Sequence, residues 1–414
     1  MNIIFVPYDD LSGPGVIHAY HFAWEIASMG NKVFFVMPGK IETLSAMERK
    51  PIFDVAKIIF DGPTLAIPLA GRIMDFRPDI IHAWTPRNIP ARVALEARVR
   101  TGARIIVHHE DDEDFIYDCE FPKSRAFRLR YALKTLSLPG PAEPFPNLWA
   151  WRNPLITRLA NSAATAFTAL APAIKKKLNG RWGKKTHLLY PGVDLERFTP
   201  RVRPAPLRER FGLSDKKLII YSGSIGHYHD FDILLDAVAK VLKTDSRVCL
   251  LQIGRFAGTE AAVEDRIAKL GIRRHVILAG MMDHKDIPSY LAAGDILVHP
   301  GRNNDFNRYR LPSKIPEYLA MGKPSIITNA GIGAEFKDRV EVLKTYTDDP
   351  GELAERIVEM FRDESLRATL CANARSAAER MFNLRRNAER LQAIYEDTLR
   401  GALRRAAPSC GASK

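Results

Sequence analysis

The chain has 414 residues, of which 46% are hydrophobic and 26% charged, a composition typical of a folded protein long enough for two domains. No apolar run reaches the roughly 18 residues that a membrane-spanning helix needs, which excludes a protein built on such helices. Lys and Arg outnumber Asp and Glu by 61 to 48, so the formal net charge of +13 favours a polyanionic partner, whether nucleic acid, acidic lipid or a phosphorylated small molecule.

The amino terminus and the cysteines indicate the compartment. The first residues, "MNIIFVPYDD", have neither the basic flank nor the cleavage site of a signal peptide, so we expect a cytoplasmic protein. The 4 cysteines are scattered along the chain without the spacing of zinc ligands. We therefore expect reduced thiols rather than disulfides or a zinc site.

In the first half of the chain, short apolar runs rich in β-branched residues alternate with helical patterns. A Gly-Pro-Gly turn follows the first run and precedes a predicted helix over 17–30. Strand and helix in alternation predict a parallel sheet that is covered on both faces. The predicted strands of this half are 2–8, 32–39, 78–86, 103–109 and 165–170.

After Pro200 the same alternation begins again. The stretch "YPGVDLERFTP" at 190–200 combines a Pro-Gly turn, a capping Asp and a closing Pro, and we interpret it as the linker between two doubly wound α/β domains. The predicted strands of the second half are 217–224, 247–254, 275–281, 295–301 and 324–329. The predicted helices are 230–243, 261–271, 284–294 and 314–322, followed by amphipathic helices from about 350 onward.

Glycines gather where the predicted strands end. Ligands of doubly wound sheets bind beyond the carboxyl ends of the strands, and glycine lets a backbone approach a phosphate closely. Gly13 and Gly15 after the first strand and Gly223 in the second half are therefore candidate ligand contacts. The alternative is that they are only the turns that any such sheet requires.

The segment "RYRLPSKIPEYLAMGKPSIITN" at 308–329 carries a resemblance to a known family. With "YPGVD", "PDIIHAW" and "VILAGMMDHKDIPSYLAAGDILVHPG" in this order, the chain resembles the retaining, nucleotide-sugar-dependent glycosyltransferases of glycosyltransferase family 4. The resemblance implies the GT-B fold, an α/β architecture in which two doubly wound, Rossmann-like domains face a cleft. The implied parts are an acceptor-side domain over 1–195, a linker over 196–214, a nucleotide-sugar-binding domain over 215–380, and a C-terminal helix and tail over 381–414 that return toward the first domain.

The resemblance also assigns roles in the donor site. It implies that Glu317, placed at the start of a helix that Gly322 ends, accepts hydrogen bonds from the ribose hydroxyls of the donor. The alternative is that Glu317 only complements the helix dipole. Ser313 and Lys314 are implied contacts of the diphosphate, and Gly280, Met281 and Met282 are implied to border the base.

Three departures from the family pattern concern charge. Tyr309 stands where relatives have a second Glu, unless Asp305 replaces it. Ser224 and His229 stand where relatives have an Arg and a Lys on the diphosphate. The negative charge of the diphosphate must then be neutralised by other residues. We single out Arg310 and Lys314 for this role, with Arg302 as a further candidate.

The run "RIIVHHEDDEDF" places two histidines at the end of a predicted strand. Neighbouring strand residues point to opposite faces, so only one of the pair can face the cleft. By resemblance to relatives with a His near the transferred sugar, we choose His109 as the catalytic candidate and keep His108 in reserve. A rival interpretation takes the acids at 112–114 as the metal-binding Asp-x-Asp of a different glycosyltransferase fold.

The segment at 119–154 combines positive charge with apolar and aromatic residues. An interfacial helix uses this pattern, which favours contact with an anionic membrane or its acceptor, whereas the alternative is a core helix with a solvated basic face. The residues singled out here are Arg125, Arg128, Arg130, Trp149 and Trp151.

The function expected from this resemblance is transfer of a hexosyl or related sugar from a nucleotide-diphosphate sugar to a glycan or lipid-linked acceptor, with retention, in cell-surface polysaccharide or glycolipid synthesis. Because no nucleic-acid motif is present, we expect no nucleic-acid partner. We expect no metal or other cofactor, and a cytoplasmic location that includes peripheral attachment to the inner face of the membrane. The alternative is a catalytically silent GT-B protein that serves as a partner in a glycan-assembly complex.

Overall fold

The chain divides into two compact units. The computed structural model describes residues 1–9, 14–47, 49–61, 64–120, 124–137, 153–226 and 230–406. Unit 1 consists of Met1–Gly192 together with Leu384–Lys414, and unit 2 consists of Val193–Asn383. The segment predicted as a linker, 196–214, therefore lies within unit 2.

Unit 1 is built on a parallel sheet with the strand order β3-β2-β1-β6-β7-β8-β9. The chain begins in the middle with β1, moves outward on one side, and crosses to β6 on the other, so the strand order reverses between β1 and β6. A short antiparallel pair, β4 and β5, lies outside this sheet. The strands are β1 (Asn2–Val6), β2 (Lys32–Met37), β3 (Asp54–Lys57), β4 (Phe60–Asp61), β5 (Thr64–Leu65), β6 (Ile80–Trp84), β7 (Arg104–His109), β8 (Ala166–Ala169) and β9 (Thr186–Leu188).

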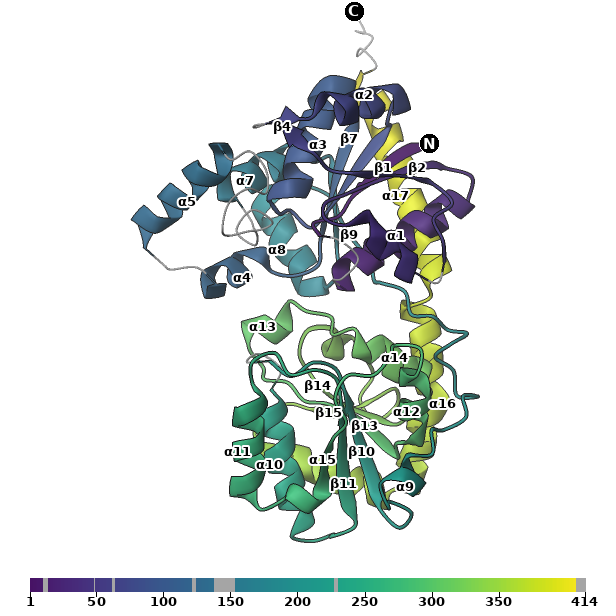
Figure 1. The fold of residues 1–414 in the computed structure, drawn as a ribbon. Coiled ribbons are helices and arrows are strands. Elements are labelled where there is room, and N and C mark those ends of the chain that lie inside the picture. Colours follow the sequence, from purple (N-terminus) through teal and green to yellow (C-terminus); the bar gives the residue numbers. More distant parts are fainter. Residues whose placement is uncertain are drawn as a thin grey trace, which may run out of the picture. The chain divides into compact units, whose positions relative to one another are not determined.

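Helices cover the sheet of unit 1 (Figure 1). Local chemistry sets their ends: the Asn153 side chain accepts from the N–H groups of Leu155 and Ile156 at the start of one helix, and Gly102 in the left-handed conformation ends another. The helices are α1 (Pro14–Ser28), α2 (Ile67–Phe76), α3 (Asn88–Thr101), α4 (Glu113–Glu120), α5 (Arg125–Ser137), α7 (Pro154–Ala163), α8 (Pro172–Trp182) and α17 (Leu384–Ala406), with a 3₁₀ turn at Ile41–Ala46.

The last described helix, α17, completes the core of unit 1. Its Leu391, Ile394 and Tyr395 pack into the same buried cluster as Phe5 of β1 and Ala23 of α1. The hydroxyl of Tyr395 lies 2.7 Å from Nδ1 of His82 in the centre of the sheet, although 313 positions separate the two residues. Unit 1 is thus assembled from the two ends of the chain.

Unit 2 repeats the architecture with a parallel sheet in the order β12-β11-β10-β13-β14-β15. The order reverses between β10 and β13, the position at which doubly wound sheets bind ligands. Its strands are β10 (Lys217–Ser222), β11 (Val248–Ile253), β12 (Val276–Leu278), β13 (Ile296–His299), β14 (Ser325–Thr328) and β15 (Leu343–Thr345). Its helices are α9 (Leu207–Arg210), α10 (Phe231–Leu242), α11 (Glu260–Leu270), α12 (Ile287–Ala293), α13 (Asp305–Arg308), α14 (Lys314–Ala320), α15 (Pro350–Arg362) and α16 (Glu364–Met381), with 3₁₀ turns at Arg273–His275 and Gly331–Glu335.

The predicted pair of doubly wound parallel sheets is confirmed, while single elements differ. The strands β3, β9 and β15 were missing from the prediction because they are short and carry polar residues, as in "DVAK". The helix predicted over 314–322 is confirmed as α14 (Lys314–Ala320), and Glu317 lies in its first turn rather than at its first residue. Among the described residues, no helix is both long and apolar enough to span a bilayer.

Candidate functional site

A lysine and a glycine meet at the carboxyl end of β10. Gly223 has φ 131°, a conformation that L side chains rarely adopt, and a β-carbon there would lie 2.7 Å from both Cε and Nζ of Lys314. The Lys314 ammonium lies 3.8 Å from the centre of the Tyr221 ring. The Lys314 side chain thus occupies the space that a side chain at position 223 would need.

The charge state of Lys314 follows from its surroundings. Burial, and after it the Arg310 guanidinium, lower the pKa of Lys314 to about 7, while the Glu317 carboxylate acts in the opposite direction. A lysine held in this way gains its proton fully when an anion arrives beside it. At neutral pH the ammonium and the neutral amine of Lys314 are therefore both populated, and a bound anion favours the ammonium.

Glu317 lies one turn after Lys314 on α14. Its Oε1 is 3.0 Å from Nε2 of His284, which lies in the loop between β12 and α12. The next residue, Tyr318, is fully buried, and its hydroxyl accepts a hydrogen bond of 2.7 Å from the backbone N–H of Ser222 at the end of β10. This bond fixes α14 against the sheet, so Lys314 and Glu317 are held at the same edge.

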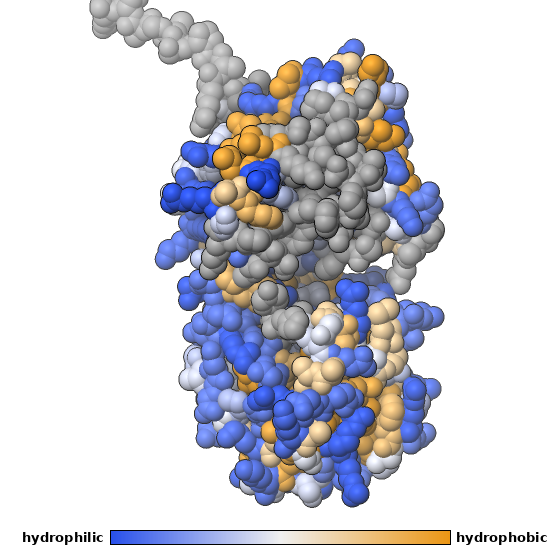
Figure 2. All heavy atoms as spheres, turned by 60° about the vertical axis from the view of Figure 1, so that its left-hand side comes forward, coloured by the Kyte–Doolittle hydropathy of each residue, from blue (hydrophilic) through white to orange (hydrophobic). Residues whose placement is uncertain are grey.

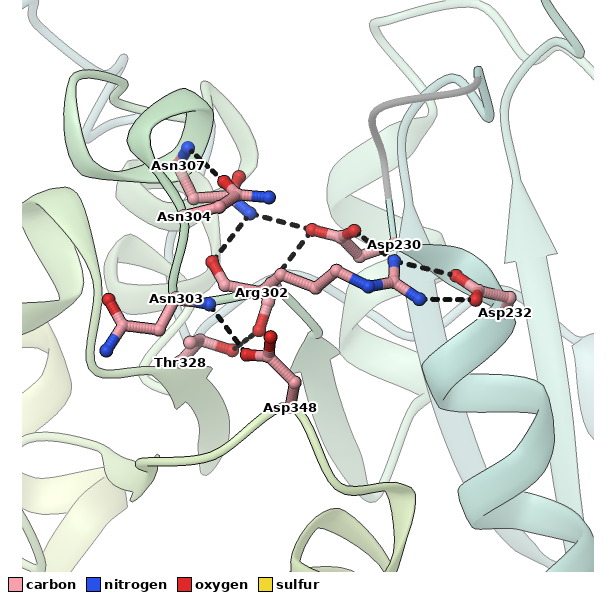
Figure 3. A network of polar contacts seen from close by, with 9 residues as sticks. Asp230, Asp232, Arg302, Asn303, Asn304, Asn307, Thr328 and Asp348 are labelled. Carbon is pink, nitrogen blue, oxygen red and sulfur yellow. Dashed lines mark hydrogen bonds and ion pairs between the residues drawn. The ribbon is translucent and has the colours of Figure 1, made fainter.

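Arg302 is engaged in ion pairs, which corrects its proposed role as a spare cation for a diphosphate. Figure 3 shows its guanidinium between the carboxylates of Asp230 and Asp232, with the Asp232 contact at 2.6 Å. Asp230 is buried and also accepts from the N–H of Arg302 at 2.9 Å and from the side chain of Asn307 at 2.7 Å. The network joins the loop before α10 to the loop after β13, next to the reversal point of the sheet.

The other predicted donor-side residues surround this edge. Arg310 stacks over the ring of Phe306 at 4.2 Å, and Ser313 is exposed at the start of α14. The carbonyl of Ser224 accepts a bond of 3.3 Å from the Tyr221 hydroxyl. His229 lies outside the described residues.

The loop expected to border a base follows β12. Gly280 has φ 74° and its carbonyl accepts a bond of 2.8 Å from Gly254 of the neighbouring strand end. Met281 is 75% exposed and Met282 is half-buried. The exposed side chain of Met281 is thus an adaptable apolar surface on this loop.

In unit 1 the structure explains Gly15 by a carboxylate rather than by a phosphate. A β-carbon at Gly15 would overlap the carboxylate of Glu110, which follows β7. Oε1 of Glu110 accepts from Nε1 of Trp84 at 3.0 Å and lies 3.1 Å from Nδ1 of His18. The expectation that Gly15 admits the donor's phosphate is therefore not needed to account for this glycine, and Gly13 lies outside the described residues.

Sequence reasoning missed the cluster around Glu110, although Glu110 opens the acid run "EDDED". The guanidinium of Arg87, after β6, lies 4.2 Å from the centre of the Tyr8 ring and 3.2 Å from the Glu113 carboxylate. Burial, together with the Glu110 carboxylate, raises the pKa of Tyr8 well above its usual value. The cluster occupies the ends of β1, β6 and β7, where the strand order of unit 1 reverses.

The two histidines of β7 point to opposite faces, because the strand continues through His109. His108 is fully buried, stacks on Trp84 at 4.0 Å and bonds to the Thr168 hydroxyl at 2.9 Å, and burial holds its pKa well below its usual value. His109 packs edge-on against Phe167 and lines a pocket of about 640 Å³. Of the two candidates, His109 is the one that a ligand in this pocket could reach.

The pocket beside His109 has apolar and charged walls. Helices α4, α5, α7 and α8 contribute to it, with Leu129, Leu155 and Trp182 among its lining residues. The three acids of the rival metal interpretation each pair with a cation, Asp112 with Lys177 at 2.7 Å, Glu113 with Arg87, and Asp114 with Arg181 at 2.7 Å. These ion pairs occupy the carboxylates that a metal ion would need.

Helix α5 presents apolar side chains outward. Leu129 and Leu133 are 61% and 55% exposed, and Arg125 and Arg130 are exposed on the same helix. Arg128 instead pairs with Asp118 of α4 at 2.8 Å. Figure 2 views the side of the molecule on which α5 lies, where hydrophobic and hydrophilic side chains of unit 1 adjoin. Trp149 and Trp151 lie outside the described residues.

Two family models match the chain, one in each half. The model described as Glycosyltransferase Family 4 matches residues 15–197, and the model described as Glycosyl transferases group 1 matches residues 216–363. The second match runs from β10 through α15 and contains Gly223, Lys314 and Glu317. Together the two matches take in most of the chain.

Curated relatives are about a quarter identical in sequence. Alpha-D-kanosaminyltransferase of Streptomyces kanamyceticus is 26% identical over 196 residues, which are 47% of this chain and 49% of that protein. The lipopolysaccharide core biosynthesis mannosyltransferase LpsB of Rhizobium meliloti is 25% identical over 217 residues, which are 50% of this chain and 60% of that protein. The chain thus matches only about half the length of these relatives.

The solved structure of Anabaena HepE in complex with UDP is similar along nearly the whole chain. Its TM-score is 0.73 at 18% sequence identity, and the match covers 96% of this chain and 100% of that one. The same protein has also been solved in complex with UDP-glucose. At this level of identity the likeness shows a shared fold.

Proposed function

Because the chain belongs to the glycosyltransferases with the GT-B fold, we propose that it transfers a sugar from a nucleotide-diphosphate sugar to a glycan or lipid-linked acceptor. The observation that carries the proposal is the arrangement of Lys314 and Glu317 on one turn of α14, held against the end of β10 by the Tyr318 hydroxyl. A cation and a carboxylate at the reversal point of a doubly wound sheet suit a diphosphate and a ribose diol.

The roles of the donor-side groups follow from their chemistry. The Lys314 ammonium neutralises part of the diphosphate charge, and the backbone N–H groups of Ser224 and Ser313 donate hydrogen bonds to it, since the N–H of Gly223 already donates to Ile253 at 2.7 Å. Glu317 accepts hydrogen bonds from the ribose hydroxyls, since an ionised carboxylate is acceptor-only. Arg310 is the second cation, and Arg302 serves instead to hold the loops that carry these groups. Uridine diphosphate sugars are the first donors to test, because HepE, which shares the fold, has been solved in complex with UDP and with UDP-glucose.

On the acceptor side, we assign His109 and its pocket to the reaction. Transfer proceeds with retention, by departure and attack on one face of the sugar, and the leaving diphosphate helps to take the acceptor's proton. His109 orients the acceptor and stabilises charge that develops near the sugar, as preorganised polar groups do. No metal ion takes part in this scheme.

The acceptor proposed here is lipid-linked or otherwise bound to a membrane. The support is α5, which presents Leu129 and Leu133 outward beside the basic side chains of Arg125 and Arg130. Each such cation near an anionic surface contributes about 1 kcal/mol to attachment. A product in cell-surface glycan or glycolipid synthesis agrees with the similarity to LpsB, a mannosyltransferase of lipopolysaccharide core biosynthesis.

Release of nucleoside diphosphate tests the proposal. Purified protein is incubated with UDP- and GDP-sugars, with and without membrane lipid extract, and the free diphosphate is measured. We expect turnover with one class of donor, and Glu317→Ala should weaken donor binding roughly ten- to a hundredfold while the protein stays folded. Binding of a donor without turnover under any condition would instead favour the silent partner of a glycan-assembly complex.

A further inference from the structure

His284 is an exposed histidine that contacts the proposed donor site. It lies in the loop between β12 and α12, four positions after Gly280, in the loop expected to border the base. Its Nε2 is 3.0 Å from Oε1 of Glu317, and the centre of its ring is 5.6 Å from that of Phe198. Its side chain is nevertheless 64% exposed, so much of the ring remains open to a ligand.

The contact fixes the position of a proton. An ionised carboxylate only accepts hydrogen bonds, so Nε2 of His284 carries the hydrogen, in the neutral ring as in the charged one. The bond uses Oε1 of Glu317, whose side chain is 16% exposed. Oε2 of the same carboxylate has no hydrogen bond to another described residue, and it is the oxygen left for a ligand.

The His284 ring also contacts Phe198, whose backbone is anchored by hydrogen bonds. Phe198 is buried, its N–H donates to the carbonyl of Asp194 at 2.8 Å, and its own carbonyl accepts from Arg375 of α16 at 2.6 Å. The His284 ring thus connects the anchored segment around Phe198 with the carboxylate of α14. His284 therefore contacts Phe198 through its ring and Glu317 through Nε2.

Building on the proposed nucleotide-sugar site, we propose that His284 is a positioning residue for recognition of the donor's ribose. Its Nε2–H holds one oxygen of Glu317 and thereby aims the other at a ribose hydroxyl. Preorganising the acceptor in this way reduces the ordering cost of binding. The consequence is a preference for a nucleoside diphosphate with an intact ribose diol over its 2′-deoxy analogue.

The test compares two ligands in the wild type and three single variants, and then repeats His284→Ala in a Glu317→Ala background. Calorimetry measures the affinity of UDP and of 2′-deoxy-UDP, or of GDP and 2′-deoxy-GDP if the wild type prefers guanine. The proteins are the wild type, His284→Ala, His284→Gln and the matched control Lys285→Ala, which alters the neighbouring exposed side chain. Gln retains an N–H donor near the place of Nε2, whereas Ala removes it.

We expect His284→Ala to weaken binding of the ribonucleotide by about five- to tenfold, the effect of losing one hydrogen bond. Binding of the 2′-deoxy ligand should change less than twofold, and His284→Gln should restore most of the affinity for the ribonucleotide. In a Glu317→Ala background, His284→Ala should have no further effect. Lys285→Ala should resemble the wild type with both ligands.

The outcomes separate this inference from the proposed function. A wild type that binds neither UDP nor GDP refutes the nucleotide-sugar proposal, and the role of His284 with it. If the wild type binds but His284→Ala behaves like Lys285→Ala, the function stands and His284 has no part in the site. Equal losses for the ribose and 2′-deoxy ligands would likewise overturn the ribose role.

Discussion

The side chain of Lys314 fills the space beside Gly223, so that a β-carbon at Gly223 would lie 2.7 Å from its Cε and Nζ. The two residues lie in different elements, Gly223 after β10 and Lys314 at the start of α14. Their contact explains both a glycine in a strand-end loop and a lysine buried at a sheet edge. The contact also brings together two residues that were expected on separate grounds to contact the donor, Gly223 as a strand-end glycine and Lys314 by family resemblance.

Gly223→Ala should therefore damage both stability and donor binding. The positive φ costs about 1–3 kcal/mol for a residue with a β-carbon, and the added methyl displaces Lys314. Denaturant unfolding measures the first effect and calorimetry with UDP the second. Gly180→Ala is the matched control, since Gly180 lies within α8 with open space around it and should be neutral or slightly stabilised. A Gly223→Ala protein as stable as Gly180→Ala would contradict the assignment.

The pKa of Lys314 predicts how pH affects the free protein and the complex. Burial depresses this pKa to about 7, below the usual value of a lysine, so above pH 7 the unfolded chain holds a proton that the folded chain has lost. The contribution of Lys314 to the free energy of unfolding consequently rises as pH increases from about 7 toward 10. An anionic diphosphate favours the charged form, so its binding above pH 7 should take up a proton.

Calorimetry at pH 8 in two buffers of different ionisation heat measures this proton uptake. The affinity of wild-type protein for UDP should fall as pH rises from 7 to 9, approaching tenfold per unit for a single linked proton. Lys314→Met should bind more weakly and lose that dependence. If the affinity for UDP changes equally with pH in the wild type and in Lys314→Met, then Lys314 does not contact the diphosphate.

His109→Ala should depress turnover far more than donor affinity. Removing a polar group that is preorganised for the transition state costs on the order of a hundredfold in rate. Donor affinity should change little, because the proposed donor contacts Glu317 and Lys314 lie in unit 2, whereas His109 lies in unit 1. Initial rates at saturating donor measure the first quantity, and calorimetry the second. Thermal melting checks that the variant is folded. A loss of donor binding with unchanged turnover would exclude this role.

Activity should survive chelation by EDTA. The proposed diphosphate contacts are backbone N–H groups and cations such as Lys314, and the acids at 112–114 are engaged by Lys177, Arg87 and Arg181. The measurement is diphosphate release before and after dialysis against EDTA. Complete loss that manganese restores would revive the rival metal interpretation.

Attachment to membranes should depend on charge and salt. The protein should float with anionic vesicles at low ionic strength and not with neutral ones, and attachment should weaken as the Debye length falls from about 10 Å at 0.1 M to about 3 Å at 1 M. Replacing Arg125 and Arg130 by Glu should abolish flotation, while Arg128 is left in place because it pairs with Asp118. The charge-matched control replaces the exposed Arg201 and Arg203 of unit 2 by Glu. A wild type that ignores anionic vesicles points to a soluble acceptor.

Local patterns in the sequence predict the elements well and their ends less well. The buried strands β1, β7 and β10 are apolar on both faces, and such runs bounded by turns are visible without a structure. The helix predicted over 17–30 begins at Pro14 instead, whereas the helix predicted over 314–322 is α14, Lys314–Ala320, although it contains Pro316. Pro316 lies in the first turn, where backbone N–H groups have no helical partner, so it is tolerated there.

Contacts between distant residues explain what the sequence could not predict about the site. Arg302 was a candidate ligand contact until the structure placed it between Asp230, 72 positions earlier, and Asp232. Gly15 was a candidate phosphate contact, but its neighbour is Glu110. Periodicity and turn chemistry report on neighbours in the chain, whereas the partner of a charged side chain depends on which strand ends the topology brings together.

The place of α17 in unit 1 affects the order in which the two units are completed during synthesis. The buried cluster that contains Leu391, Ile394 and Tyr395 is formed, apart from α17, by residues that are synthesised before unit 2, whereas α17 is synthesised after unit 2. At roughly 5–20 residues per second, the intervening stretch of about 190 residues takes about 10–40 s to translate. Of the two units, the one whose synthesis begins first is therefore completed second, and until then α17 does not cover the apolar side chains of its cluster.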